Sequence, residues 1–200
     1  AWLPCRSALL SRSRASSRSK ADALLSSGGG SGGALPSPYD KPEPMSAKPL
    51  FDRPIAHRGL HDRSKGIIEL AGAWKRLRAE FPNLHLLLVG PYEAQDPISP
   101  EVDEELRRDA RVHLIGEEWN TPPLYAAMDV LALPTYREGF PNVLLEAAGM
   151  NVPVVATRVP GCTDAVQDGV TGLLVSPFDP EPLAAAGEGA VQAAQGDAQL

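Results

Sequence analysis

Two glutamates stand eight residues apart in the stretch TYREGFPNVLLEAAGM. Glu138 follows an apolar run, and Glu146 falls about two turns into a helix that Pro141 opens. Between them Gly139 lets the backbone approach a ligand closely, and a helix N-terminus presents unpaired amides with partial positive charge. This arrangement suits a diphosphate, and a carboxylate such as Glu146 can accept hydrogen bonds from both hydroxyls of a ribose. From spacing alone, two solvated surface glutamates are an equally good interpretation.

Alternating helical and strand periods surround these residues from residue 64 onward. The pattern predicts strands at 84–90, 112–116, 129–134, 152–157 and 171–175. It predicts helices at 65–81 with Ser64 as N-cap, 101–109, 121–128, 141–148 with Gly149 at C′, 162–167 and from 180. Short loops between them predict an α/β fold with a doubly wound parallel sheet. Such sheets bind ligands at the carboxyl ends of their strands, so we expect function in loops 90–92, 116–120, 134–140 and 158–162.

Composition divides the 200 residues into two parts. Residues 1–65 carry 11 Lys or Arg and 5 Asp or Glu, a net charge of +6, whereas residues 66–200 carry 8 and 20, a net charge of −12. Residues 1–49 are rich in Ser, Gly, Pro and Arg, and we expect them to be disordered. A flexible tail, a fusion scar or an organelle transit peptide would each have this composition. We therefore predict a tail at 1–49, a junction at 50–65 and a domain at 66–200.

Several classes of protein are disfavoured by the composition. No apolar run reaches the 18 or so residues that a membrane helix needs. Cys5 and Cys162, without a C-x-x-C pair, predict no disulfide framework and no thiolate metal site, which is typical of a reducing compartment. The first 21 residues, which are basic, contain a single aromatic residue, Trp2, so we expect no nucleic-acid partner. His85 and His113 lie inside apolar strands and are better interpreted as packing residues than as ligands.

A family resemblance rests on several words of the sequence. EGFPNVLLEAAGMNVPVVAT resembles the E-x₇-E signature of retaining, nucleotide-sugar-dependent family-4 glycosyltransferases. Further similar words are SKGIIELAGAWKRL, LLLVG, PPLYAAMDVLALPTYREGF and DAVQDGVTGLLVSPFDPEPLAAA, so the resemblance covers about 64–186. It implies the Rossmann-like C-terminal half of a B-type (GT-B) glycosyltransferase, which binds the sugar donor. Because the acceptor-binding half is missing from this sequence, we expect a donor-binding domain with little or no transfer activity of its own.

The resemblance also implies roles for individual residues. Lys65 would contact the donor diphosphate, Glu138 would lie beside the transferred sugar, and Glu146 would hold the ribose. Catalysis would rest mainly on stabilising the negative charge that grows on the leaving phosphate, with Lys65 and the helix dipole supplying that stabilisation. We do not assign Glu138 the role of a nucleophile, although retaining glycosidases use a carboxylate in that way.

Other implied residues surround the phosphates and the sugar. The amides at 139–141 (Gly139, Phe140 and Pro141) would support the phosphates, and Arg137 and Asp164 would line the sugar pocket. Arg137 is equally compatible with a solvated loop position. The resemblance implies no metal and no cofactor besides the donor substrate, for which uridine-linked sugars are the family's commonest choice. The acceptor would be a glycan or a lipid-linked molecule. The protein would lie in the cytoplasm, at the inner face of the membrane.

The segment before the helix at 65–81 departs from the transferase pattern. The family's arginine after Gly59 is replaced by Leu60, and LFDRPIAHRGLHDRSKGIIE resembles the start of glycerophosphodiester phosphodiesterases. His57, Arg58 and Glu69 would match catalytic and metal positions of that barrel family, but none of the remaining barrel follows. We therefore predict a chimera joined near 65–69, in which 50–60 is no buried strand; a divergent transferase edge is the alternative.

Overall fold

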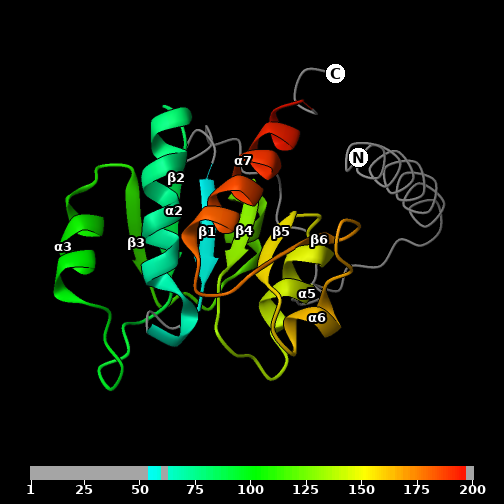
Figure 1. The fold of residues 1–200 in the computed structure, drawn as a ribbon, viewed down its shortest axis with the longest axis horizontal. Coiled ribbons are helices and arrows are strands. Elements are labelled where there is room, and N and C mark those ends of the chain that lie inside the picture. The colour runs from blue at the N-terminus through cyan, green and yellow to red at the C-terminus, as the bar shows by residue number, and fades with distance from the viewer. Residues whose placement is uncertain (1–53, 60–62, 197–200) are drawn as a thin grey trace, which may run out of the picture. The chain divides into compact units, whose positions relative to one another are not determined.

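Six parallel strands form the centre of the fold in the computed structural model (Figure 1), which describes residues 54–59 and 63–196. The strands lie in the order β3-β2-β1-β4-β5-β6, and each pairs in parallel with its neighbours. Their bounds are β1 Pro54–Arg58, β2 His85–Val89, β3 Val112–Gly116, β4 Val130–Leu133, β5 Val154–Thr157 and β6 Gly172–Val175. The predicted doubly wound α/β fold is confirmed. Strands β2 and β3 are added on one side of β1, and β4 to β6 are added on its other side. Open α/β sheets bind ligands where the strand order reverses in this way, which here is between β1 and β4.

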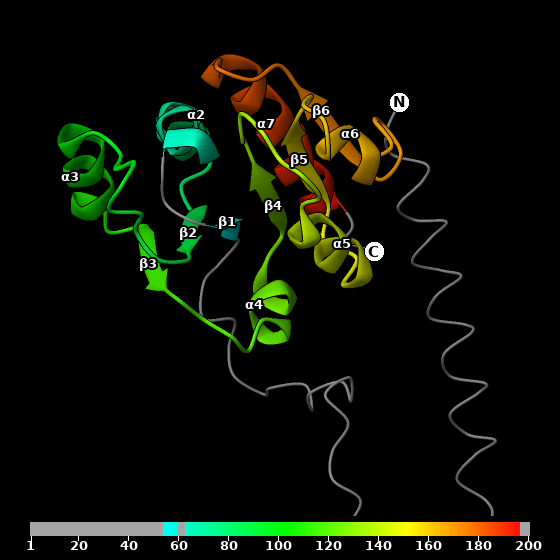
Figure 2. The same cartoon turned by 90° about the horizontal axis from the view of Figure 1, so that it is seen from below.

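Helices cover both faces of the sheet, and Figure 2 shows α2 and α3 on the opposite side from α4. The helical elements are η1 Arg63–Lys65, α2 Ile67–Glu80, α3 Pro100–Arg108, α4 Pro122–Ala127, α5 Asn142–Gly149, α6 Cys162–Ala165 and α7 Pro180–Gly196. One buried apolar cluster joins α2, α3 and α7 to the sheet, and a second joins α4, α5 and α6. Strand residues alternate between the two clusters, for example Ile55 and Ala56, because successive side chains point to opposite faces.

The central strand β1 corrects the prediction that residues 50–60 form no buried strand. Ile55, Ala56 and His57 are buried, and β1 pairs with β2 along its whole length and with β4 at two positions. Pro54 is tolerated because it is the first residue of the strand, where a missing amide donor costs little. The polar His57 is accommodated because its Nδ1 contacts the carbonyl oxygen of Ala132 at 3.1 Å. Residues 54–58 therefore form a central strand of the sheet, contrary to the chimera hypothesis.

The described residues also contradict the phosphodiesterase interpretation. They form an open sheet whose edges are β3 and β6, whereas that activity belongs to a closed barrel of eight strands. His57, Arg58 and Glu69 do not meet in one cluster there. His57 bonds within the sheet, Arg58 contacts Glu146, and Glu69 accepts a hydrogen bond from the Tyr136 hydroxyl at 2.7 Å.

Both helix caps that the sequence predicts differ from the observed ones. Helix α2 begins at Ile67 and its N-cap is Gly66, with a φ of 69°, so Ser64 lies two residues too early to be the cap. Helix α5 includes Gly149, and the left-handed residue that ends the turn is Asn151, with a φ of 59°. Asparagine tolerates this conformation better than most residues other than glycine.

Two further expectations concern parts of the chain that the structure does not reach or only partly covers. The expected disordered tail at 1–49 and Leu60 lie outside the described residues. Among the residues that are described, no helix is both long enough and apolar enough to cross a membrane.

Candidate functional site

Two loops meet at the carboxyl ends of β1 and β4. The amide of Tyr136 donates to the carbonyl oxygen of Ser64 at 2.8 Å, and the Thr135 hydroxyl donates to the same oxygen at 3.2 Å. Gly66 permits this approach, since a Cβ there would lie 2.0 Å from the Pro134 carbonyl oxygen. The segment from Ser64 to Gly66 is thus fixed against the loop that follows β4.

The contact between these loops brings Lys65 and Glu138 together. The Lys65 Nζ lies 2.6 Å from the Glu138 Oε1, and their side chains are 21% and 14% exposed. Gly161, at the start of α6, packs closely against the same loop, since a Cβ there would lie 2.5 Å from the Gly139 carbonyl oxygen. Next to it Cys162 is buried; burial and the nearby Glu138 raise the pKa of its thiol to about 12, and Lys65 offsets part of this rise. A cation and a carboxylate therefore share a partly enclosed position.

A second charged pair lies at the same edge of the sheet. Glu146 is on α5, and its Oε2 lies 2.9 Å from the Arg58 Nη1 at the end of β1. Arg58 also reaches the hydroxyl of Tyr125, on α4, at 3.4 Å. Burial, with the charge of Glu146, raises the pKa of Tyr125 to about 12, and Arg58 opposes this shift. Tyr125 therefore stays neutral at physiological pH and can act as a hydrogen-bond donor.

The start of α5 lies between the two pairs along the chain. Gly139 and Phe140 are exposed, and a Cβ on Gly139 would meet nothing within 4 Å, so the backbone is open to a ligand there. Pro141 is buried and precedes the helix, but it offers no donor because proline has no N–H. The expectation of support from residue 141 is therefore wrong for an amide. The helix supplies instead the first-turn amides of Asn142 and Val143, which have no partner within the helix.

The remaining predicted residues lie on exposed parts of the same edge or elsewhere in the sheet. Arg137 is exposed in the loop after β4, and Asp164 is exposed on α6, so their place beside a sugar stays a prediction. His85 and His113 contact each other between β2 and β3, with Nδ1 3.0 Å from Nε2, as expected of packing residues. Burial and the neighbouring His85 lower the pKa of His113.

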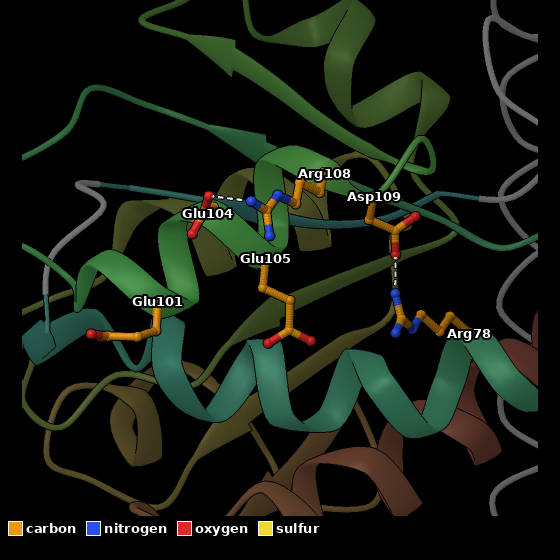
Figure 3. Close-up of a pocket in the computed structure, with 6 residues that line it drawn as sticks. All are labelled: Arg78, Glu101, Glu104, Glu105, Arg108 and Asp109. Carbon is orange, nitrogen blue, oxygen red and sulfur yellow. Dashed lines mark hydrogen bonds and ion pairs between the residues drawn. The ribbon is translucent and has the colours of Figure 1, made fainter.

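A groove of about 320 Å³ lies on a different part of the surface, between α2 and α3. Figure 3 shows its lining residues, which are Arg78, Glu101, Glu104, Glu105, Arg108 and Asp109. Their charges are largely paired, Arg78 with Asp109 at 2.7 Å, Arg108 with Glu104, and Glu105 with Lys75 at 2.8 Å. The groove contains none of the residues at the carboxyl ends of β1 and β4.

Comparison with known proteins identifies the family. Residues 55–192 match the model described as glycosyl transferases group 1. The chain belongs to this family. The match begins at residue 55 and so includes β1, which contradicts the predicted junction at 65–69 and supports the alternative of a divergent transferase strand.

Curated members of the family extend well beyond this chain. CapM, a capsular polysaccharide biosynthesis glycosyltransferase of Staphylococcus aureus, is 35% identical over 130 residues, which are 65% of this chain and 34% of CapM. A D-inositol 3-phosphate glycosyltransferase of Corynebacterium kroppenstedtii is 32% identical over 146 residues, covering 69% of this chain and 32% of that protein. The chain thus spans about a third of the length of these relatives.

Solved structures place the chain in one half of a glycosyltransferase. Anabaena HepE in complex with UDP-glucose is 27% identical, with a TM-score of 0.59 over 70% of this chain and 42% of HepE. WaaG, a glycosyltransferase of lipopolysaccharide biosynthesis, is 26% identical, with a TM-score of 0.62 over 72% and 39%. The C-terminal domain of LpcC from Francisella tularensis, at 22% identity, shares the fold over 72% of this chain and 82% of that domain, with a TM-score of 0.62. The fold is that of a GT-B C-terminal domain.

The sequence alone did not reveal Arg58 and Tyr125 as part of this site. The sequence suggests Arg58 only as a phosphodiesterase residue, although the apolar Ile55 and Ala56 before it and Gly59 after it are a signal for the end of a buried strand. Tyr125 lies within an ordinary helical pattern, and nothing in its spacing distinguishes it from a core residue.

Proposed function

We propose that this chain binds a nucleoside-diphosphate sugar, uridine-linked, at the carboxyl ends of β1 and β4. The observation that carries the proposal is the Lys65–Glu138 pair at 2.6 Å, fixed at the reversal of strand order beside the open backbone at Gly139. In this proposal Lys65 and the amides at the start of α5 receive the diphosphate. Glu138 lies beside the sugar, and Glu146 accepts hydrogen bonds from the ribose.

The proposed chemistry is transfer of the sugar with retention of its anomeric configuration. As the bond between the sugar and the β-phosphate breaks, negative charge grows on the phosphate, and fixed positive groups stabilise it most effectively. Lys65 and the N-terminus of α5 supply such groups. Glu138 accepts a hydrogen bond from Lys65 and so orients the ammonium group. We assign no covalent intermediate to Glu138.

The relatives support the donor class and suggest the acceptor class. HepE has been solved with UDP and with UDP-glucose, and CapM is named for capsular polysaccharide biosynthesis. We therefore propose a glycan or lipid-linked acceptor, met at the cytoplasmic face of a membrane. Arg137 and Asp164 are proposed to border the sugar, because both lie on loops or helices at the carboxyl edge of the sheet.

Calorimetric titration of the full chain with UDP and UDP-glucose tests the proposal. Glu146→Ala should weaken binding by about 1–3 kcal/mol, or roughly 5- to 150-fold, the scale for hydrogen bonds left unmade. The matched control is Glu101→Ala, which removes an exposed carboxylate from the groove between α2 and α3 and should leave affinity unchanged. Equal affinity of Glu146→Ala and the unmodified chain for UDP would contradict the ribose assignment.

A further inference from the structure

The guanidinium of Arg58 links three elements at the edge of the sheet. It extends from the last residue of β1, contacts the Glu146 carboxylate on α5 at 2.9 Å and reaches the Tyr125 hydroxyl on α4 at 3.4 Å. It also lies over the Tyr125 ring, 6.0 Å from its centroid. The Arg58 and Glu146 side chains are 24% and 39% exposed, so a ligand can reach the pair.

The backbone on both sides of this contact is well fixed. Strand β1 is hydrogen-bonded to β2 along its length and to β4, so the Arg58 Cα has little freedom. Tyr125 is buried, and its hydroxyl donates to the Val143 carbonyl oxygen of α5 at 3.4 Å. Arg58 therefore contacts Glu146 from a rigid base.

Glu146, in contrast, is a long and partly exposed side chain. Fixing a free glutamate side chain costs conformational entropy, which a ligand would have to overcome on binding. The hydrogen bond from the Arg58 Nη1 to the Glu146 Oε2 already restricts the glutamate side chain before a ligand binds. An ionised carboxylate has about four acceptor positions on its two oxygens, so one contact to Arg58 leaves capacity for two hydroxyl groups.

We propose that Arg58 is a positioning residue for Glu146 in donor recognition. It holds the carboxylate in the orientation that accepts the two ribose hydroxyls, and it acts through Glu146 without touching the diphosphate. This inference rests on the proposed function, in which Glu146 binds the ribose. It gives Arg58 a part in nucleotide recognition that differs from direct phosphate binding by a guanidinium.

The test compares ligands that differ in the ribose hydroxyls. Arg58→Met keeps much of the side-chain length and the packing on Tyr125 but removes the charge, whereas Arg58→Lys keeps the charge with a single donor group. Calorimetry with the full chain would measure affinities for UDP and for 2′,3′-dideoxy-UDP. For coupled neighbours we expect Arg58→Met to weaken UDP binding about three- to thirtyfold, with Arg58→Lys in between. Binding of dideoxy-UDP should change less than about twofold, because the group positioned by Arg58 has no partner there.

A double-mutant cycle with Glu146→Gln excludes a purely structural role. If Arg58 acts through Glu146, the loss caused by Arg58→Met should largely vanish in the Glu146→Gln background. If Arg58→Met weakens the binding of UDP and dideoxy-UDP equally, the proposal is overturned and direct phosphate contact is indicated. If Arg58→Met binds UDP more tightly than the unmodified chain does, the proposal is also overturned, because Arg58 would then compete with the ribose. Wild-type chain that binds UDP and dideoxy-UDP equally would contradict the ribose role of Glu146 in the proposed function. Arg58→Lys gives the same comparison of ligands should Arg58→Met fail to fold.

Discussion

Replacement of Gly66 by alanine should break the contact that assembles the site. Gly66 has a φ of 69°, and a Cβ there would lie 2.0 Å from the Pro134 carbonyl oxygen and 2.8 Å from its carbonyl carbon. Neither atom can move easily, because both belong to the backbone that leaves β4. The loop before α2 must therefore separate from the loop after β4, and Lys65 must move away from Glu138.

The expected loss of stability follows from the contacts involved. A left-handed conformation costs a residue with a Cβ about 1–2 kcal/mol. Separation of the loops removes the hydrogen bonds that Tyr136 and Thr135 donate to Ser64, each worth about 0.5–1.5 kcal/mol. Together we expect Gly66→Ala to lower the free energy of unfolding by about 2–5 kcal/mol.

Urea unfolding at pH 7, analysed by linear extrapolation, measures this difference. The matched control is Gly189→Ala on α7, where a Cβ would meet nothing within 4 Å. That change should be neutral or stabilise by up to about 1 kcal/mol, because alanine favours a helix more than glycine does. If the unfolding free energy of Gly66→Ala lies within about 0.5 kcal/mol of that of the unmodified chain, the usual range for surface changes, Gly66 does not hold the two segments together.

Two further predictions concern titratable groups. Burial by itself raises the pKa of Asp109, but hydrogen bonds from the Arg111 amide, Arg78 and Trp74 outweigh it and hold the pKa below the ordinary value. The stability that ionised Asp109 contributes to the fold is therefore present above about pH 4 and lost as the pH falls through the lowered pKa. The difference in unfolding free energy between the unmodified chain and Asp109→Asn should shrink toward pH 2, and a constant difference would contradict this. The Cys162 thiol, with a pKa of about 12, should react with iodoacetamide at pH 8 roughly a thousandfold more slowly than in urea, as measured by mass spectrometry of its peptide; equal rates would show that the thiol is not buried.

The sequence allowed most of the fold to be predicted because its signals are local. Five of the strands are apolar runs that end near Gly, Pro or a turn, and the helix at 67–80 shows a clear spacing of apolar residues. Strand β1 was missed because FDRPIAH contains Pro54 and the charged residues Asp52 and Arg53, which are unusual in a buried strand. Its place depends on neighbours far along the chain, since the β2 and β4 strands that flank it supply the ladder and the Ala132 carbonyl that His57 contacts.

The candidate site could be predicted in its parts but not in its pairings. Lys65, Glu138 and Glu146 were identified from sequence words that resemble a family, and the structure brings the first two together. The contact of Arg58 with Glu146 joins residues 88 positions apart, and it depends on the register of β1 and on the direction of α5. No local spacing pattern in the sequence indicates a contact between residues so far apart along the chain.

A crystal structure of the full chain with UDP bound would show where the nucleotide lies. We predict the ribose hydroxyls within hydrogen-bond distance of the Glu146 carboxylate, which still contacts Arg58. We also predict the diphosphate at the start of α5, near Lys65. A nucleotide bound elsewhere, for example in the groove between α2 and α3, or one whose ribose does not contact Glu146, would contradict these predictions.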